Sequence, residues 1–349
     1  MRESLLLLGG ILLLAGCSRD AAAPASQPDH VYVSDERGDA VVEIDPANGT
    51  IVRRFAPGQR PRGLLLSPDG RQLYVAVSGS PIGGPGVDGS NLPAADHGKD
   101  GIAVIDLSSG KTERVLPAGT DPETFAISPD GRTLFVSNED RGAVSAVAIE
   151  GGRAPLSTRI GEEPEGIAVT PDGARLFVAC EASDYVAMLD ARTLRLIKTI
   201  PIAGRPRGLL MSKDGSTVYV SVESGGKLAL IGADDGAPQK VIDLAHGDEA
   251  VKPMGIVEAG DGHLFITTGR DGAVLDVDPR TGAIVRRIAA VGARPWGIAR
   301  TSDGRLLVTA NGPSNDVAVI DRASGRIVRR IAAGKGPWGV ASAAGGGAQ

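Results

Sequence analysis

The segment PEGIAVTPDGARLFVACEASDYVAMLDARTLRLIKTI (residues 164–200) contains one complete copy of a repeat that runs through most of the chain. Each copy starts with Pro, any residue and usually Gly, continues as a short apolar run, and then reaches a turn that is usually Asp-Gly. The steps between copies are 61, 42, 42, 47, 42 and 42 residues, from starts at Pro61, Pro122, Pro164, Pro206, Pro253, Pro295 and Pro337. A period near 42 residues indicates stacked copies of one supersecondary unit.

One repeat unit predicts four short β-strands. The apolar or alternating runs in the quoted copy are Gly166–Thr170, Leu176–Cys180, Tyr185–Asp190 and Leu194–Ile200. The first two runs are separated by Pro171-Asp172-Gly173, where Pro presets φ and Gly accepts the left-handed conformation. Four strands in a unit of this length are typical of a β-propeller blade.

The two ends of the repeat region predict seven blades. The last copy, Pro337–Ser342, supplies an inner strand with nothing after it, whereas Val31–Ser34, Val41–Asp45 and Ile51–Phe55 supply three strands with no inner strand before them. Six whole blades and one blade shared by the two ends therefore give an all-β, seven-bladed propeller. Pairing the ends also covers strand edges that would otherwise invite aggregation.

The N-terminal segment resembles that of bacterial lipoproteins. Leu14-Ala15-Gly16-Cys17 has the form of a lipobox, and the apolar stretch before it, Leu5–Ala15, has 11 residues. A membrane-spanning helix needs about 20, so the stretch is interpreted as the hydrophobic part of a signal peptide. The resemblance implies lipidation of Cys17 and a periplasm-facing protein, and Ser18 after the cysteine favours the outer membrane.

These observations divide the chain into four parts. We expect a signal peptide at residues 1–16, a lipidated cysteine and flexible tether at 17–29, the propeller at 30–343, and a disordered tail at 344–349. The tether is rich in Ala, Pro and Ser, a composition that gives an open linker.

Composition excludes several classes of function. The net charge of −5 and the lack of a basic run argue against nucleic-acid binding. The four histidines and two cysteines form no zinc spacing and no haem attachment motif, and the chain has no serine-nucleophile elbow. We therefore expect no cofactor, and expect catalysis to be less probable than binding.

The repeat resembles the YVTN-type family of seven-bladed propellers between about Val31 and Ser342. The resemblance is carried by Leu-Tyr-Val or Leu-Phe-Val strands, Ser-Pro-Asp-Gly turns and Val-Ala-Val-Ile-Asp strands. Segments such as Arg60-Pro61-Arg62-Gly63 and Glu163-Pro164-Glu165-Gly166 are similar to β-propeller proteins associated with PQQ-dependent catabolism. This similarity implies a pathway and does not imply a reaction. The irregular segment 78–101 departs from the pattern.

The interblade loops predict a first ring of side chains at one mouth of the propeller, formed by the residue after each repeat proline. Variable loops and both insertions, at 78–101 and 245–251, lie on this mouth face, where function is expected to concentrate. One arc of the ring is charged and the other is apolar and aromatic, which suits a small ligand with a polar and a flat end. The alternative is that the Arg and Glu side chains simply pair and the Trp rings cap the channel. The charged and aromatic members are Arg62, Glu123, Glu165, Arg207, Trp296 and Trp338.

A second ring is predicted where the second strand of each blade ends. Its acidic members could bind a cation such as Ca²⁺, which needs several oxygen ligands, or could attract a basic partner. The alternative is a solvated acidic rim whose carboxylates are too far apart to share an ion, so a metal is neither assigned nor excluded. The acidic members are Glu36, Glu139, Glu181 and Glu223.

The favoured interpretation is a non-enzymatic binding or scaffold lipoprotein that holds a periplasmic protein or a small molecule at the mouth. The resemblance implies a setting in PQQ-linked oxidative catabolism. One alternative is a lactonase-like hydrolase, which needs acid, His and Arg side chains within hydrogen-bond reach at the mouth. A second is a haem d1-type cofactor carrier, which needs an axial histidine there. His97 and His246, in the two insertions, are the candidates.

Overall fold

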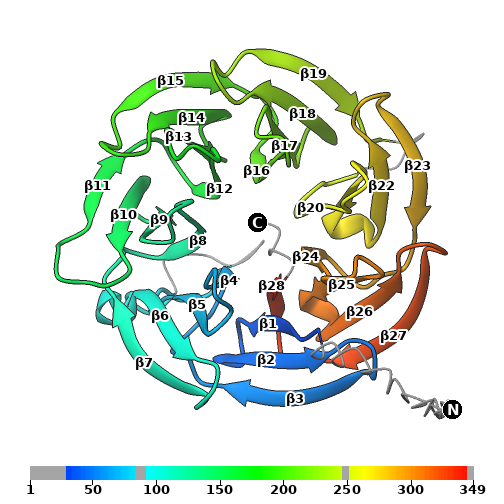
Figure 1. The fold of residues 1–349 in the computed structure, drawn as a ribbon, viewed down its shortest axis with the longest axis horizontal. Coiled ribbons are helices and arrows are strands. Elements are labelled where there is room, and N and C mark those ends of the chain that lie inside the picture. The colour runs from blue at the N-terminus through cyan, green and yellow to red at the C-terminus, as the bar shows by residue number, and fades with distance from the viewer. Residues whose placement is uncertain (1–28, 84–91, 246–250, 344–349) are drawn as a thin grey trace, which may run out of the picture.

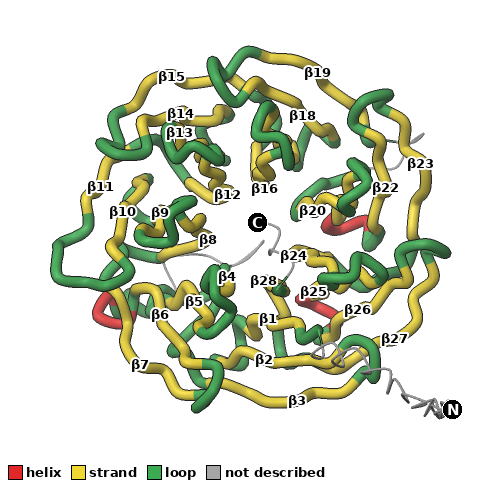
Figure 2. Tube along the Cα trace, in the orientation of Figure 1, coloured by secondary structure: helices red, strands yellow, loops and turns green. Residues whose placement is uncertain are grey.

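The computed structural model describes residues 29–83, 92–245 and 251–343 of the chain. Its regular structure is almost entirely strand, and helix is confined to the short turns coloured red in Figure 2. These 3-10 turns are η2 (His97–Lys99), η3 (Gly269–Asp271) and η4 (Gly312–Ser314). In the described residues, no helix is both long and apolar enough to cross a membrane.

Seven four-stranded antiparallel sheets surround a central channel, as Figure 1 shows, and the predicted all-β, seven-bladed propeller is confirmed. Blade 1 contains β4 (Leu64–Leu66), β5 (Gln72–Val77), β6 (Gly101–Asp106) and β7 (Lys111–Leu116). Blade 2 contains β8 (Pro122–Ile127), β9 (Thr133–Asn138), β10 (Ala143–Ala148) and β11 (Leu156–Arg159). Blade 3 contains β12 (Pro164–Val169), β13 (Arg175–Cys180), β14 (Tyr185–Asp190) and β15 (Leu196–Pro201). Blade 4 contains β16 (Pro206–Met211), β17 (Thr217–Val222), β18 (Lys227–Gly232) and β19 (Pro238–Asp243). Blade 5 contains β20 (Ile256–Glu258), β21 (Leu264–Thr267), β22 (Val274–Asp278) and β23 (Ala283–Ile288). Blade 6 contains β24 (Pro295–Arg300), β25 (Leu306–Asn311), β26 (Asp316–Asp321) and β27 (Arg326–Ala332).

The two ends of the chain share the seventh blade, as the repeat arithmetic predicts. Its strand order is β28 (Pro337–Ser342), β1 (Val31–Asp35), β2 (Ala40–Asp45) and β3 (Thr50–Phe55). Strand β28 pairs antiparallel with β1, in a register that places Val33 opposite Val340. This contact closes the ring between segments about 300 residues apart.

The glycine of each Pro-any-Gly start permits close approach of neighbouring inner strands. A Cβ built on Gly166 would lie 2.1 Å from the carbonyl oxygen of Arg207, in the next blade. Blade 2 has Thr124 at the equivalent position, and there the side-chain hydroxyl donates a hydrogen bond to the carbonyl of Glu165 at 2.7 Å. The repeat glycine therefore sets the width of the channel.

The core is divided among the joints between blades. Aliphatic residues that alternate along the strands meet those of the next blade, as Val186 and Ile200 of blade 3 meet Leu209 and Val220 of blade 4. Each blade therefore buries its apolar surface mainly against its two neighbours.

Basic side chains on outer strands join several blades at the rim. Each donates to a backbone carbonyl in the last hairpin of the next blade, where the tight turn leaves acceptors free. The pairs are Arg114 to Ile149 (3.3 Å), Lys198 to Asp235 (3.0 Å), Lys240 to Arg280 (2.7 Å) and Arg286 to Ala323 (2.9 Å).

Candidate functional site

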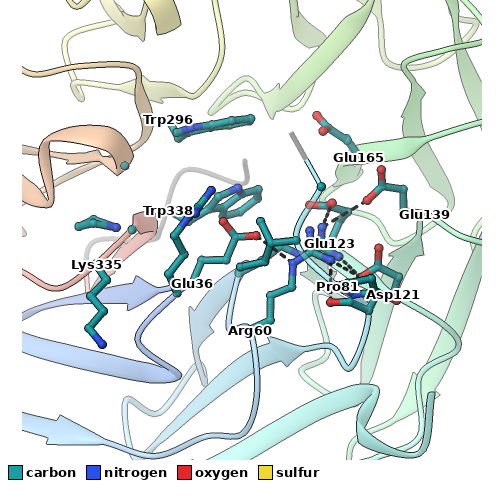
Figure 3. Close-up of a pocket in the computed structure, with 18 of the residues that line it drawn as sticks. Glu36, Arg60, Pro81, Asp121, Glu123, Glu139, Glu165, Trp296, Lys335 and Trp338 are labelled. Carbon is teal, nitrogen blue, oxygen red and sulfur yellow. Dashed lines mark hydrogen bonds and ion pairs between the residues drawn. The ribbon is translucent and has the colours of Figure 1, made fainter. Parts of the chain in front are cut away.

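The mouth face contains a pocket of about 980 Å³, which we call the mouth pocket. The pocket is lined by interblade loops, by the ends of second strands and by part of the 78–101 insertion, including Ser80 and Ala95. Figure 3 shows the indole rings of Trp296 and Trp338 across the pocket from Glu139 and Glu165. Residues that lie far apart in the sequence thus face one space.

Residues immediately before the repeat prolines direct their side chains toward the mouth from an unusual backbone conformation. At five of these seven positions φ is positive, a conformation that costs non-glycine residues about 1–3 kcal/mol and that clusters at functional sites. The repeat pattern predicted the residues after the prolines as mouth residues but did not predict these positions as a group. Its members with positive φ are Arg60 (47°), Asp121 (50°), Glu163 (48°), Arg205 (65°) and Arg294 (51°).

Arg62 is the centre of one ion-pair network. Its side chain is almost fully buried and donates to Asp121 at 2.5 Å, to Glu139 at 3.3 Å and to Glu123. Asp121 also accepts from Arg60 at 3.2 Å and from the Ser78 hydroxyl at 2.6 Å. Burial raises the pKa of Asp121, and the two guanidinium groups oppose that rise.

The same three carboxylates form the one group in the described residues that is close enough for a shared metal ion. Single oxygens of Asp121, Glu123 and Glu139 lie within 4.8 Å of one another. However, the Arg62 guanidinium donates to all three carboxylates and supplies the positive charge that a cation would bring. We therefore assign no metal ligands here.

Arg207 is the centre of a second network. Its three donor nitrogens reach Glu165 at 2.8 Å, Glu181 at 2.8 Å and Glu223 at 2.7 Å. Arg205 adds contacts to Glu181 and, at 3.3 Å, to Glu163. Glu36 accepts from Arg60 at 3.0 Å. The predicted acidic side chains therefore pair with arginines of the first ring, Arg62 and Arg207, and with arginines that precede the repeat prolines, Arg60 and Arg205. In this arc of the mouth the Arg and Glu side chains pair with each other, as the alternative interpretation of the first ring expected.

Glu165 differs chemically from the other acids of the mouth. Burial raises its pKa to about 7, a rise that Arg207 opposes and that the negative charges of Glu139 and Glu223 reinforce. Glu165 lines the mouth pocket and also a small cavity of about 20 Å³ beneath it, together with Thr124, Arg207 and Met254. A cavity of that volume is large enough for one water molecule, and Thr124, Glu165 and Arg207 supply the polar side chains of its lining.

The two tryptophans form the wall beside this carboxyl group. Their rings stack with centroids 5.8 Å apart, and both line the small cavity. The guanidinium groups of Arg294 and Arg207 lie 4.5 and 5.0 Å from the Trp296 ring, within the range of cation–π contacts. Both rings line the mouth pocket together with Glu165, so the carboxyl group is reached from the pocket beside the stacked indoles.

The described histidines lie away from the pocket lining. His97 bonds to the buried Asp100 at 2.7 Å, which raises the pKa of the imidazole, and its other nitrogen is 3.9 Å from Asp140 at the pocket rim. His30 and His263 bond to Glu43 and Asp276 at 2.8 and 2.7 Å. His246 lies outside the described residues. None of the three described histidines is part of the lining of the mouth pocket.

Comparisons with known proteins give the fold a wider context. No protein-family model matches the chain. The antigen Lp49 of Leptospira interrogans is 29% identical over 137 residues, which are 31% of this chain and 30% of the antigen, so the chain matches less than a third of that relative's length.

Two solved structures cover nearly all of the propeller. The periplasmic gluconolactonase of Pseudomonas aeruginosa is 20% identical with a TM-score of 0.72, covering 90% of this chain and 98% of its own. A putative 6-phosphogluconolactonase from Bacteroides fragilis is 16% identical with a TM-score of 0.71, covering 92% and 99%. At these identities the likeness shows the fold: a seven-bladed propeller with structural neighbours among the 6-phosphogluconolactonase-like propellers.

The expectation of a non-enzymatic binding or scaffold module is wrong on these findings. Lactonase-like propellers recur among the structural neighbours, and they fit the alternative of a lactonase-like hydrolase better. The physical reason is that zinc, haem and serine-nucleophile sites have sequence motifs, which this chain lacks, whereas a carboxyl group whose pKa is raised by burial has none.

Proposed function

We propose that the chain is a lactone hydrolase whose active site is the mouth pocket. The observation that carries the proposal is Glu165, a carboxyl group with a pKa near 7 at the boundary between the pocket and a cavity with room for one water. A general base works best when its pKa is close to the operating pH. The lactonase-like neighbours supply the reaction class.

The proposed step is attack of water on the lactone carbonyl. Ionised Glu165 takes a proton from the water as its oxygen bonds to the carbonyl carbon, and the carbonyl electron pair moves onto oxygen. Arg207, 2.8 Å from Glu165, holds that carboxylate in place beside the water. The ring C–O bond then breaks, and the leaving ring oxygen takes the proton from Glu165. Lactone and water give one hydroxy acid, and the carboxylate is regenerated.

The test is an assay of the purified protein on five- and six-membered lactones, read by acid release above the buffer rate. We expect activity to rise with pH and level off above about 7, because Glu165 must be ionised. Glu165→Gln should lose about 100-fold or more in kcat. Glu162→Gln, at an exposed position three residues away, is the matched control and should keep wild-type activity. Wild-type protein that hydrolyses no lactone in the panel overturns the proposal.

We also propose the cellular setting that the N-terminal motif favours. Cys17 would carry the lipid, the propeller would face the periplasm, and the outer membrane is favoured; residues 1–28 lie outside the described structure. Cys17→Ser should release the protein from the membrane fraction, and unchanged fractionation with no loss of acyl mass would contradict the anchor. Membership of the YVTN-type repeats, and a setting near PQQ-dependent catabolism, are part of this proposal and assign no reaction.

A further inference from the structure

The two sides of the mouth pocket differ in how their charges are compensated. On the side of blades 1 to 4, Arg62 and Arg207 are each surrounded by carboxylates. On the side of blades 6 and 7, the pocket is lined by Arg37, Arg294 and Lys335, and none of the three has an ion-pair partner among the residues that the structure describes. The pocket therefore presents unpaired positive charge on one side only.

Arg294 is the least exposed of these unpaired cations. It is half-buried in the interblade loop before β24, with its guanidinium 4.5 Å from the Trp296 ring and with φ at 51°. Burial lowers its pKa, and the like charges of Arg207 and Arg270 lower it further. A charged group removed from water without a partner is unfavourable, and an anion bound beside it would relieve that cost.

We propose that Arg294 binds a carboxylate group of the substrate, so that the substrate is a lactone bearing an acid group. This inference rests on the proposed lactone hydrolysis and deepens it. The planar guanidinium matches a carboxylate in a bidentate arrangement. A carboxylate carries a single charge, which one unpaired guanidinium neutralises, whereas a phosphate ester would bring nearly two. Arg37 and Lys335 are exposed and lie in the loops of blade 7, so neither adds a second buried positive charge beside Arg294.

The position of Arg294 gives the bound acid an orientation. Trp296, beside Arg294, also lines the small cavity that Glu165 borders. A substrate with its carboxylate on Arg294 would therefore extend along the indole wall toward Glu165. Its reacting carbonyl would face the proposed water, and its acid group would stay on the positive side of the pocket. Arg294 is thus assigned to specificity rather than to the chemical step.

Binding of simple probes tests the site without requiring turnover. Calorimetry with glucuronate, glucose 6-phosphate and glucose should show that wild-type protein binds the carboxylate probe best and the neutral sugar least. Arg294→Gln should weaken glucuronate binding at least tenfold, with partial recovery in Arg294→Lys. Arg192→Gln, an exposed residue on the opposite face, should leave it unchanged. Glucose 6-phosphate binding more tightly than glucuronate, or equal glucuronate binding by wild type and Arg294→Gln, overturns the assignment.

Kinetics separates this inference from the proposed function. For acidic lactones, Arg294→Gln should raise KM about tenfold and change kcat little, while neutral lactones should be unaffected. If no lactone is hydrolysed but glucuronate still binds through Arg294, the hydrolase proposal fails and the carboxylate site stands. If lactones are hydrolysed through Glu165 and Arg294→Gln affects acidic and neutral lactones equally, the carboxylate site fails and the hydrolase stands.

Discussion

The mouth face and the opposite face of the propeller use the same residue types in different ways. On the opposite face, which we call the turn face, hydroxyl groups donate to aspartates two positions later, as in Ser67 to Asp69, Thr170 to Asp172 and Ser212 to Asp214, each at 2.6 Å. At the mouth, Arg62 reaches Asp121 and Glu139, which are 59 and 77 positions away. Turn-face contacts are local and partly buried, whereas mouth contacts are long-range and are formed by the almost fully buried Arg62.

The two faces also shift the pKa values of their acidic side chains in opposite directions. A turn aspartate such as Asp214 has its pKa lowered to about 2 by hydrogen bonds from Ser212 and Ser216, because those bonds stabilise the charged form. Glu165 at the mouth has its pKa raised to about 7 by burial. The ionised form is therefore stabilised at Asp214 on the turn face and destabilised at Glu165 on the mouth face, where the proposed chemistry occurs.

Removal of the longest-range contact should have the largest effect. A chain ending at residue 336 lacks β28, whose six residues are all buried and which pairs with β1. We expect the truncated chain to show no cooperative unfolding transition, because the lost free energy of unfolding approaches that of a whole typical domain, about 5–15 kcal/mol. Calorimetry and size-exclusion chromatography measure this, with a chain ending at residue 343 as control. A soluble monomer that lacks β28 and melts at the wild-type temperature would contradict the closing role.

Loss of a buried mouth cation should come next. Arg62→Met leaves the carboxylates of Asp121 and Glu123 buried with too few partners, which should cost about 3–5 kcal/mol. The loss should grow with rising pH, since the folded-state pKa values of these acids would lie above their unfolded values. The control is Arg71→Met on the turn face, where the side chain is 83% exposed, and it should be nearly neutral. Urea unfolding at pH 5 and pH 8 compares the two, and equal effects would remove the distinction between the faces.

Glu165→Gln should change how stability depends on pH. The folded-state pKa of about 7 lies above the ordinary value of 4.5, so the ionised group costs stability, and wild-type stability should fall as pH rises through this window. The substitution should remove about 2–3 kcal/mol of that fall. The variant should therefore equal or exceed the wild type in unfolding free energy at pH 8, but not at pH 5. Parallel stability curves from pH 5 to pH 8 would show that the carboxyl group titrates normally.

Asp214→Asn on the turn face should have the smallest effect and the opposite pH dependence. The folded-state pKa of about 2 lies below the ordinary value of 3.8, so the carboxylate contributes stability above about pH 4 and loses it as pH falls toward 2. The melting temperature of the variant should be slightly low at pH 7 and equal to that of the wild type at pH 2. A deficit at pH 7 as large as that of Arg62→Met would mean that local turn contacts matter as much as the buried networks.

The same division explains how much could be predicted from the sequence. Pro171-Asp172-Gly173 and its repeats predicted strands, turns and blade number because their interactions lie within a few residues. Spacing also placed Arg62, Glu165 and Arg207 at the mouth. Spacing could not predict which acid pairs with which arginine, because those partners come from different blades. Arg294 was missed because its orientation depends on a left-handed φ, and the pKa of Glu165 depends on burial that only the assembled ring creates.

The shared blade also has a consequence for chain connectivity. The β28–β1 pairing has the antiparallel form of the inner pair in each of the other blades, with a register irregularity near the start of the inner strand that also occurs, for example, in β12–β13. Every blade could therefore come first in the chain, and the junction between β28 and β1 is one of several equivalent places at which the ring could be opened. A circular permutant that joins residue 343 to residue 30 and opens at Asp130-Gly131 would keep every blade interface. Such a permutant should form the same mouth although its blades are synthesised in a different order. The site therefore depends on closure of the ring and not on which blade comes first in the chain.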